Sequence, residues 1–155
     1  MIALLRPLLA AICLGVAAPI ASADALADLI AAYEAFNEAG DPEQSAKAAG
    51  EAPDRWSDVS PEYVKARAEQ AAEMLETLKA LEAPKANPEI AILRHLLTAQ
   101  INAHAYDTAR IPFIGDWGFF AEAPYTAMRT RANTRAKAEA WIARLNDLPR
   151  YFDNH

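Results

Sequence analysis

Apolar residues recur at helical spacing in four stretches of this chain, and no stretch alternates apolar and polar residues over the length of a strand. This pattern predicts helices over about 25–39, 61–81, 88–109 and 134–148. The predicted fold is therefore all-α: a helical hairpin or bundle fragment, with a long aromatic loop between the third and fourth helices.

The second and third predicted helices have the clearest starts. Ser60 and Asn87 are suited to cap helix N-termini, and each is followed by a proline and then a glutamate. The apolar stripes that follow contain Val64, Ala68, Ala71, Leu75 and Leu78 in one helix, and Ile90, Leu93, Leu97 and Ile101 in the other. Because the connection between these helices is short, we expect them to pack as an antiparallel hairpin.

The remaining segments are less regular. Residues 41–59 are rich in turn-forming residues and predict a loop, with a short helical turn near 43–49. Residues 110–133 predict a second, unusually apolar loop. In the last predicted helix, the residues expected to face inward are Ala138, Trp141, Ile142, Leu145 and Leu148.

The first 23 residues have the layout of a secretory signal peptide. Arg6 precedes an apolar run over 8–18, Pro19 interrupts it, and small residues stand at 21 and 23 before Asp24. We therefore expect an exported, periplasmic or secreted protein with a mature region over 24–155, and no membrane attachment after cleavage. An uncleaved anchor is the alternative, although the apolar run is short for a bilayer.

Charge and cysteine content exclude several classes of function. The net charge of −6 argues against a nucleic-acid-binding protein and against a polybasic membrane-surface protein. Cys13 is the one cysteine, and it would leave with the signal peptide. The mature chain would then have no disulfide, thiolate metal site or cysteine nucleophile.

The histidines and carboxylates form no recognisable catalytic pattern. His95 and His104 lie nine residues apart on one predicted helix, so they point to roughly opposite sides and cannot share a metal ion. His104 falls on the apolar stripe and is interpreted as a hydrogen-bonded core histidine; a ligand or acid–base role and a contact with a downstream domain are the alternatives. Glu69, Glu73 and Glu76 predict a solvated helix face. The sequence therefore predicts no catalytic, cofactor-binding or metal-binding residue.

A basic run stands out in this acidic chain, with Arg129, Arg131, Arg135 and Lys137 and no acid between them. One interpretation is pairing with acids elsewhere in a larger protein. The other is recognition of a carboxylate or phosphate on a ligand.

An aromatic segment, with Asp116, Trp117, Phe119 and Phe120 beside Gly115 and Gly118, is the second candidate. It is interpreted either as an apolar plug that holds the loop on the helices, or as the lining of a substrate cleft. Six residues are therefore the candidates for a cleft or an interdomain contact: Asp116, Trp117, Phe119, Phe120, Arg129 and Arg131.

Four segments, at 54–62, 93–97, 116–120 and 143–153, together resemble the N-terminal part of a bacterial family known as domain of unknown function 885. The resemblance implies a helical zinc metallopeptidase-like protein several times longer than this chain, with a His-Glu-x-x-x-x-His-like metal motif far downstream. No residue of this chain matches that motif, so no metal ligand carries over. The chain departs from the family where Arg135 and Lys137 replace the acids usual in the first turn of the fourth helix.

The last residues predict the start of a further helix, with Pro149 in its first turn and Tyr151 and Phe152 beginning an apolar face. We therefore expect a truncated protein: the non-catalytic N-terminal scaffold of an exported, zinc-dependent, peptidase-like hydrolase. Its partner would be the missing C-terminal catalytic portion, its substrate a peptide, and zinc would be present only in the full-length parent. The alternative is a self-sufficient exported helical bundle with a binding or structural role.

Overall fold

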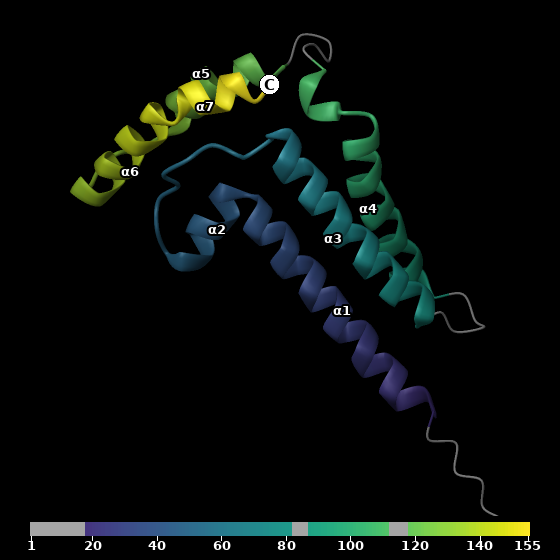
Figure 1. Ribbon diagram of the computed structural model, residues 1–155. Helices are drawn as coiled ribbons and strands as arrows, with labels where there is room; N and C mark the ends of the chain where they lie inside the picture. The colour runs from purple at the N-terminus through teal and green to yellow at the C-terminus, as the bar shows by residue number, and fades with distance from the viewer. Residues whose placement is uncertain (1–17, 82–86, 112–117) are drawn as a thin grey trace, which may run out of the picture.

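The computed structural model describes residues 18–81, 87–111 and 118–155, with side chains from Asp24 onward. Every regular element in these ranges is a helix, which confirms the predicted all-α class (Figure 1). The elements are α1 (Ala18–Gly40), α2 (Pro42–Ala49), α3 (Pro61–Ala80), α4 (Pro88–Ala105), the 3₁₀ turn η1 (Thr108–Arg110), α5 (Phe119–Arg129), α6 (Arg135–Asn146) and α7 (Leu148–Asp153).

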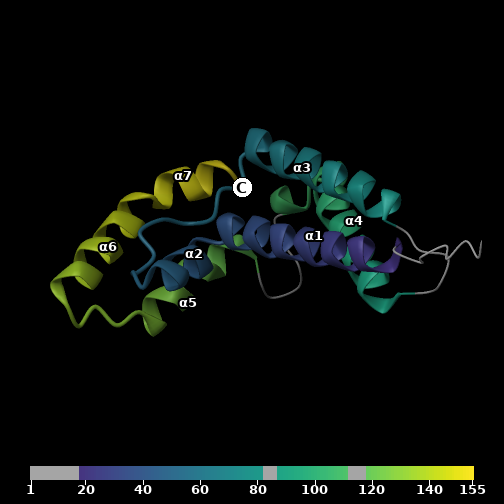
Figure 2. The ribbon, with the colours of Figure 1, turned by 90° about the horizontal axis from the view of Figure 1, so that it is seen from below.

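Helices α3 and α4 form the predicted hairpin, and their capping residues are those expected from the sequence. The Ser60 hydroxyl accepts a hydrogen bond from the Tyr63 amide at 3.3 Å. The Asn87 side chain accepts one from the Glu89 amide at 2.8 Å. Helix α1 lies alongside the hairpin, as Figures 1 and 2 both show. These three helices make the first layer of the fold.

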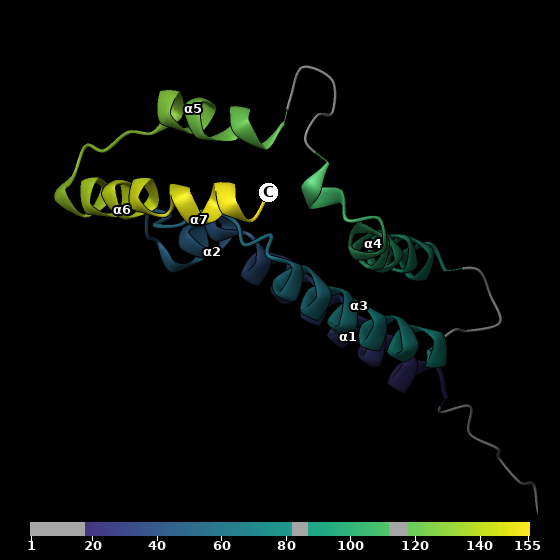
Figure 3. The same ribbon diagram turned by 45° about the horizontal axis from the view of Figure 1, so that its top comes forward.

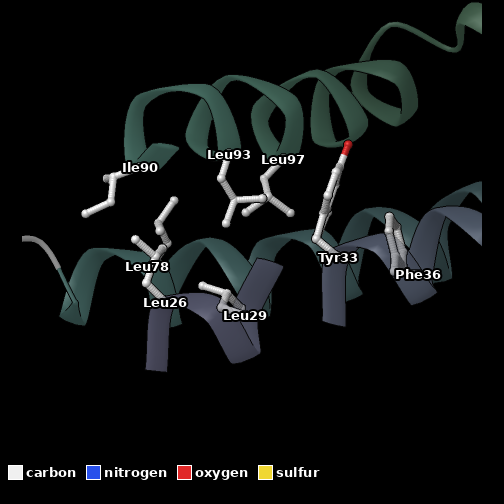
Figure 4. Close-up of a cluster of buried hydrophobic side chains, with 9 residues drawn as sticks. Leu26, Leu29, Tyr33, Phe36, Leu78, Ile90, Leu93 and Leu97 are labelled. Atoms are coloured by element: carbon white, nitrogen blue, oxygen red, sulfur yellow. The ribbon is translucent and has the colours of Figure 1, made fainter. Parts of the chain in front are cut away.

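One apolar cluster holds this layer together (Figure 4). Leu78 and Leu97 are completely buried between α3 and α4. The remaining members come from all three helices: Leu26, Leu29, Tyr33 and Phe36 of α1, Ala71 of α3, and Ile90 and Leu93 of α4. Since burial of apolar area is the main favourable term in folding, this cluster is the principal core of the described chain.

Arg67 of α3 holds the C-terminal end of α1. Its guanidinium carbon lies 3.6 Å from the centre of the Phe36 ring. Its Nη1 donates to the Phe36 carbonyl at 2.9 Å, near the C-terminal end of α1, where a cation is favoured by the helix dipole. A Cβ at Gly40 would come within 2.6 Å of the same guanidinium. A side chain at position 40 would therefore displace the guanidinium from its place on Phe36.

A second layer is formed by α5, α6 and α7. Figure 3 shows α6 and α7 following one another along nearly the same line, with α5 beside them. Helix α2 and the loop over 51–59 connect this layer to α1 and α3. The short helical turn predicted near 43–49 is confirmed as α2, where Asp41 caps the Glu43 amide at 2.8 Å.

Helix α5 contradicts the predicted loop over 110–133. It extends for 11 residues and contains Pro124 in its interior. A proline at this position removes one helical hydrogen bond, and such an interior proline typically costs about 3 kcal/mol, so local sequence favours a break. Helix α5 packs against α7, and we infer that this tertiary contact offsets the cost of the interior proline.

Two predicted helix boundaries are also wrong. Helix α4 ends at Ala105 rather than near 109, because Asp107 adopts a left-handed conformation with φ of 49°. Helix α1 starts at Ala18 rather than near 25, and it runs through the predicted cleavage junction. Pro19 is its second residue, a position where a missing amide hydrogen costs nothing.

The inward face of α6 differs from the prediction. Ile142 and Leu145 are exposed, with 57% and 41% of their surface accessible, whereas Arg144 is only 5% exposed. Trp141 and Leu148 are half-buried. The inward face is thus rotated toward Arg144, because a long cationic side chain can bury its stem and stack its head on an aromatic ring.

The outer surface of the hairpin carries charged and polar side chains, together with the exposed Ile92 and Leu96 of α4. Glu69, Glu73 and Glu76 are exposed, as predicted for a solvated face. His95 and His104 are exposed as well, so the interpretation of His104 as a core histidine is wrong. The buried residues of α4 are Ile90, Leu93 and Leu97, so the buried part of its apolar stripe ends before His104. No helix in the described ranges combines the length and apolar character that crossing a bilayer requires.

Substitution of a core leucine tests which contacts stabilise the hairpin. We expect Leu97→Ala to lower the free energy of unfolding by about 2–5 kcal/mol, because Leu97 is fully buried. The matched control is Leu96→Ala on the same helix, where the side chain is 38% exposed and the loss should be about 1 kcal/mol or less. Urea denaturation followed by circular dichroism measures both, and equal losses would contradict the proposed core.

Candidate functional site

The indole of Trp56 joins the 51–59 loop to α6 and α7. The side chain is 1% exposed, and its ring lies 5.2 Å from that of Tyr151. Its Nε1 donates to the Arg144 carbonyl at 2.8 Å, and its backbone amide donates to Asp147 Oδ2 at 2.8 Å. Both donors of this buried residue are therefore satisfied by the second layer.

Asp147 and Arg150 complete this contact, and we call the four residues Trp56, Asp147, Arg150 and Tyr151 the Trp56 junction. Arg150 binds the Asp147 carboxylate through two hydrogen bonds of 2.6 Å and donates to the Trp56 carbonyl at 2.9 Å. The hydrogen bond from Arg150 lowers the pKa of Asp147 from its usual value, and Asp147 in turn raises the pKa of Arg150. The junction therefore contains an ionised pair, Asp147 and Arg150, with bidentate geometry.

A second group of polar contacts extends the junction toward α3 and η1. Asp58 accepts from the Ser60 amide at 2.9 Å and from the Asn154 side chain at 3.4 Å. Arg110 donates to the Val59 carbonyl at 2.7 Å and to the Asn154 carbonyl at 3.2 Å. The start of α3, the turn after α4 and the end of α7 are thus fastened to one another.

Phe119 packs onto α7. Its ring is stacked on that of His155, with 4.6 Å between the centroids and an angle of 7° between the planes. The Tyr151 hydroxyl donates to the Phe119 carbonyl at 3.1 Å, and burial raises the pKa of Tyr151. His155 Nδ1 lies 2.7 Å from the Ala109 carbonyl. These contacts hold Phe119 within the protein.

The structure does not bring the described sequence candidates together. Asp116 and Trp117 lie outside the described residues. Phe119 and Phe120 begin α5, whereas Arg129 ends it and Arg131 follows. A helix of this length separates its ends by about 15 Å. The aromatic candidates therefore lie at the start of α5 and the basic candidates at its end. At the aromatic end, Phe120 is 43% exposed.

Arg144 lies beside the basic candidates. Its guanidinium carbon is 4.1 Å from the centre of the Trp56 ring, and its Nη2 binds Glu43 at 2.9 Å. Arg129 lies over the Tyr125 ring at 5.2 Å and donates to its hydroxyl at 3.3 Å. Arg131 makes a long contact of 3.5 Å with the Met128 carbonyl.

Two cavities meet at Arg144. One, of about 320 Å³, is lined by Arg129 together with Glu43 and Glu122. The other, of about 310 Å³, is lined by Arg131 and Lys137 together with Glu51, Pro53 and Trp141. The first cavity has balanced charges, whereas the second has an excess of cations. The second cavity can therefore hold an oxyanion.

A larger cleft of about 680 Å³ lies between the first layer and α2, but its charged groups already have structural partners. Asp41 caps α2, Asp58 binds the Ser60 amide, and Arg67 binds the Phe36 carbonyl. The cavities at Arg144 are therefore the stronger candidate for a ligand site.

The described residues contain no group of three or more histidine, cysteine, aspartate or glutamate side chains placed to hold a metal ion. Arg135, the other cation predicted near the start of α6, is paired with Glu139 at 2.8 Å.

A family model described as "Bacterial protein of unknown function (DUF885)" matches residues 42–155. The chain belongs to the DUF885 family. The match begins at α2 and includes the Trp56 junction and both cavities at Arg144. No match was found among curated proteins or among solved structures.

Sequence reasoning missed part of the site in this DUF885 chain. It selected Arg131 by its charge, but it did not select Arg144, Glu51 or Pro53. Lys137, Trp141 and Arg144 stand at i, i+4 and i+7, which places them on one face of α6. That spacing was available in the sequence, whereas the approach of the 51–53 loop to this face was not.

The Asp147–Arg150 pair makes a pH-dependent contribution to the stability of this DUF885 chain. We expect Asp147→Asn to lower the free energy of unfolding at pH 7 by about 1–2 kcal/mol, since the 37% exposed Arg150 side chain is partly screened by solvent. The folded-state pKa of Asp147 is lowered, so the contribution is complete above the unfolded pKa of about 3.9 and is lost as the pH falls through the folded value.

Urea denaturation at pH 7 and at several lower values measures this effect. The difference between wild type and Asp147→Asn should shrink as the pH falls below about 4. Asp153→Asn, which removes an exposed carboxylate from the C-terminal end of α7, is the control and should change little. A difference that stays constant at all these pH values would contradict an ionised Asp147–Arg150 pair.

Proposed function

We propose that this chain is the non-catalytic helical scaffold of an exported, zinc-dependent, peptidase-like hydrolase of the DUF885 family. Membership of the family supports the proposal, because the resemblance implies a longer, helical zinc metallopeptidase-like protein. Zinc and the water that it activates would be held by sequence beyond these 155 residues.

The scaffold role is supported by the polar groups at and beside the Trp56 junction, which bind one another and backbone groups. Two of the segments that bear the resemblance, 54–62 and 143–153, meet there. Asp58 and Asp147 bind Arg150 and backbone amides. Carboxylates engaged in this way position helices, and a general base must instead reach a substrate.

Exposed apolar side chains on the second layer support a covering partner. Ile142 and Leu145 lie on the outward face of α6, and Phe152 of α7 is 41% exposed. We propose that the catalytic portion of the hydrolase packs against α6, and that its substrate is a peptide.

Recombining the two parts tests this scaffold role. Residues 24–155 alone should show no zinc-dependent peptide hydrolysis. Adding the catalytic portion of a longer DUF885 member, from which the matching N-terminal region has been deleted, should restore hydrolysis that EDTA removes. The measurement is cleavage of a fluorogenic peptide library.

The double variant Ile142→Asp, Leu145→Asp should abolish this restoration, because it introduces two charges into the proposed contact. Ile92→Asp, at a 60% exposed position on α4, is the control and should leave restoration unchanged. EDTA-sensitive hydrolysis by residues 24–155 alone would overturn the scaffold proposal.

The alternative is a self-sufficient exported helical bundle with a binding or structural role. Burial of Tyr151 favours it, since this residue is 5% exposed and its hydroxyl binds the Phe119 carbonyl. This alternative predicts a monodisperse chain that unfolds cooperatively, whereas an uncovered scaffold should aggregate through its apolar surface. Sedimentation velocity and calorimetry distinguish the two.

Export is testable independently of activity. When the precursor is expressed in a secreting bacterium, we expect the recovered protein to begin at Asp24, with an intact mass that lacks residues 1–23. Replacing Ala21 and Ala23 by leucine should block cleavage, because the site requires small residues. Recovery of the uncleaved chain from the cytoplasm would contradict export.

A further inference from the structure

The cavity beside α6 has the composition of a small ligand site. Its volume is about 310 Å³, at the lower end of the range typical for ligand pockets. Lys137, Trp141 and Arg144 line it from one face of α6, and Arg131 and Pro53 line it from the segments opposite. Cationic groups therefore surround a partly apolar space.

The charges around this cavity favour a monoanion, because one excess positive charge offsets the desolvation cost of one negative charge and not of two. Arg131, Lys137 and Arg144 contribute three positive charges, Glu51 contributes one negative charge, and Glu43 pairs with Arg144. One positive charge is left in excess. Within the described part of the chain, Arg131 and Lys137 have no carboxylate partner, in contrast to Arg135, which pairs with Glu139.

Arg144 supplies a second, independent observation. Its side chain is 6% exposed, and Nε is buried without a hydrogen-bond partner among the described residues. A buried donor without an acceptor is costly. An acceptor that enters the cavity and turns the guanidinium would offer the bond that the described residues do not supply.

From these observations we infer that the cavity binds a small monoanionic carboxylate carried on a flat or apolar body. The carboxylate lies among Arg131, Lys137 and Arg144, where charge-assisted hydrogen bonds are available, including the acceptor that Arg144 Nε lacks. The apolar body packs against Trp141 and Pro53. This inference does not depend on the proposed hydrolase function.

Titration of the full-length chain with benzoate tests the site. Benzoate has one negative charge and a flat ring, and benzamide is its neutral analogue. We expect saturable binding of benzoate in the millimolar range, observed by tryptophan fluorescence and amide chemical shifts, and much weaker binding of benzamide. Trp141→Phe should remove the fluorescence change while Trp56 remains.

Charge substitutions localise the binding. The double variant Arg131→Gln, Lys137→Gln should weaken benzoate binding about tenfold or more, because it removes both accessible cations. Arg135→Gln is the matched control, since it removes a positive charge from the same helix without lining the cavity. All three positions are exposed, so circular dichroism should report unchanged folding.

Phenyl phosphate distinguishes a monoanion site from a general oxyanion site, because it carries about two charges at neutral pH. We expect it to bind more weakly than benzoate. Tighter binding of phenyl phosphate, equal binding of benzoate and benzamide, or equal weakening by Arg135→Gln would each overturn the inference. Absence of any saturable binding of benzoate would overturn it as well.

Discussion

The second layer of this fold depends on how the polar groups of one buried tryptophan are satisfied. Trp56 places two N–H donors and a carbonyl where water cannot reach them, and α6 and α7 supply the partners. These helices have little apolar core of their own, since Arg144 and Tyr151 are their buried residues. The hydrogen bonds of Trp56 therefore determine where α6 and α7 lie.

The first layer is stabilised in a different way. Helices α1, α3 and α4 bury a continuous apolar cluster, and Arg67 adds a hydrogen bond from α3 to α1. Between the layers, Arg110 and Asp58 bind backbone groups at the start of α3 and the end of α7. The result is a bundle held by apolar burial, joined to a smaller layer held by hydrogen bonds.

The sequence predicted those features that depend on near neighbours. Caps at Ser60 and Asn87 act within three residues, so the starts of α3 and α4 were predictable. Helix α5 was not predicted because Pro124 disfavours a helix locally, and the packing against α7 is not visible in the sequence. At the candidate site, Arg131 stood out by charge, but Arg144 became a site residue only because Trp56, 88 positions earlier, covers it. The helical periodicity of a sequence does not reveal contacts between residues so far apart.

The large sequence separation between Trp56 and its hydrogen-bond partner Asp147 has a consequence for folding. Its amide and Asp147 are 91 residues apart, whereas α3 and α4 are consecutive helices. Closing a long loop costs entropy before its contacts form, and local contacts escape most of that cost. We expect the α3–α4 hairpin to form first and the layer of α5, α6 and α7 to dock late. During synthesis, the α3–α4 hairpin would therefore be folded before residues 144–147 are available to bind Trp56.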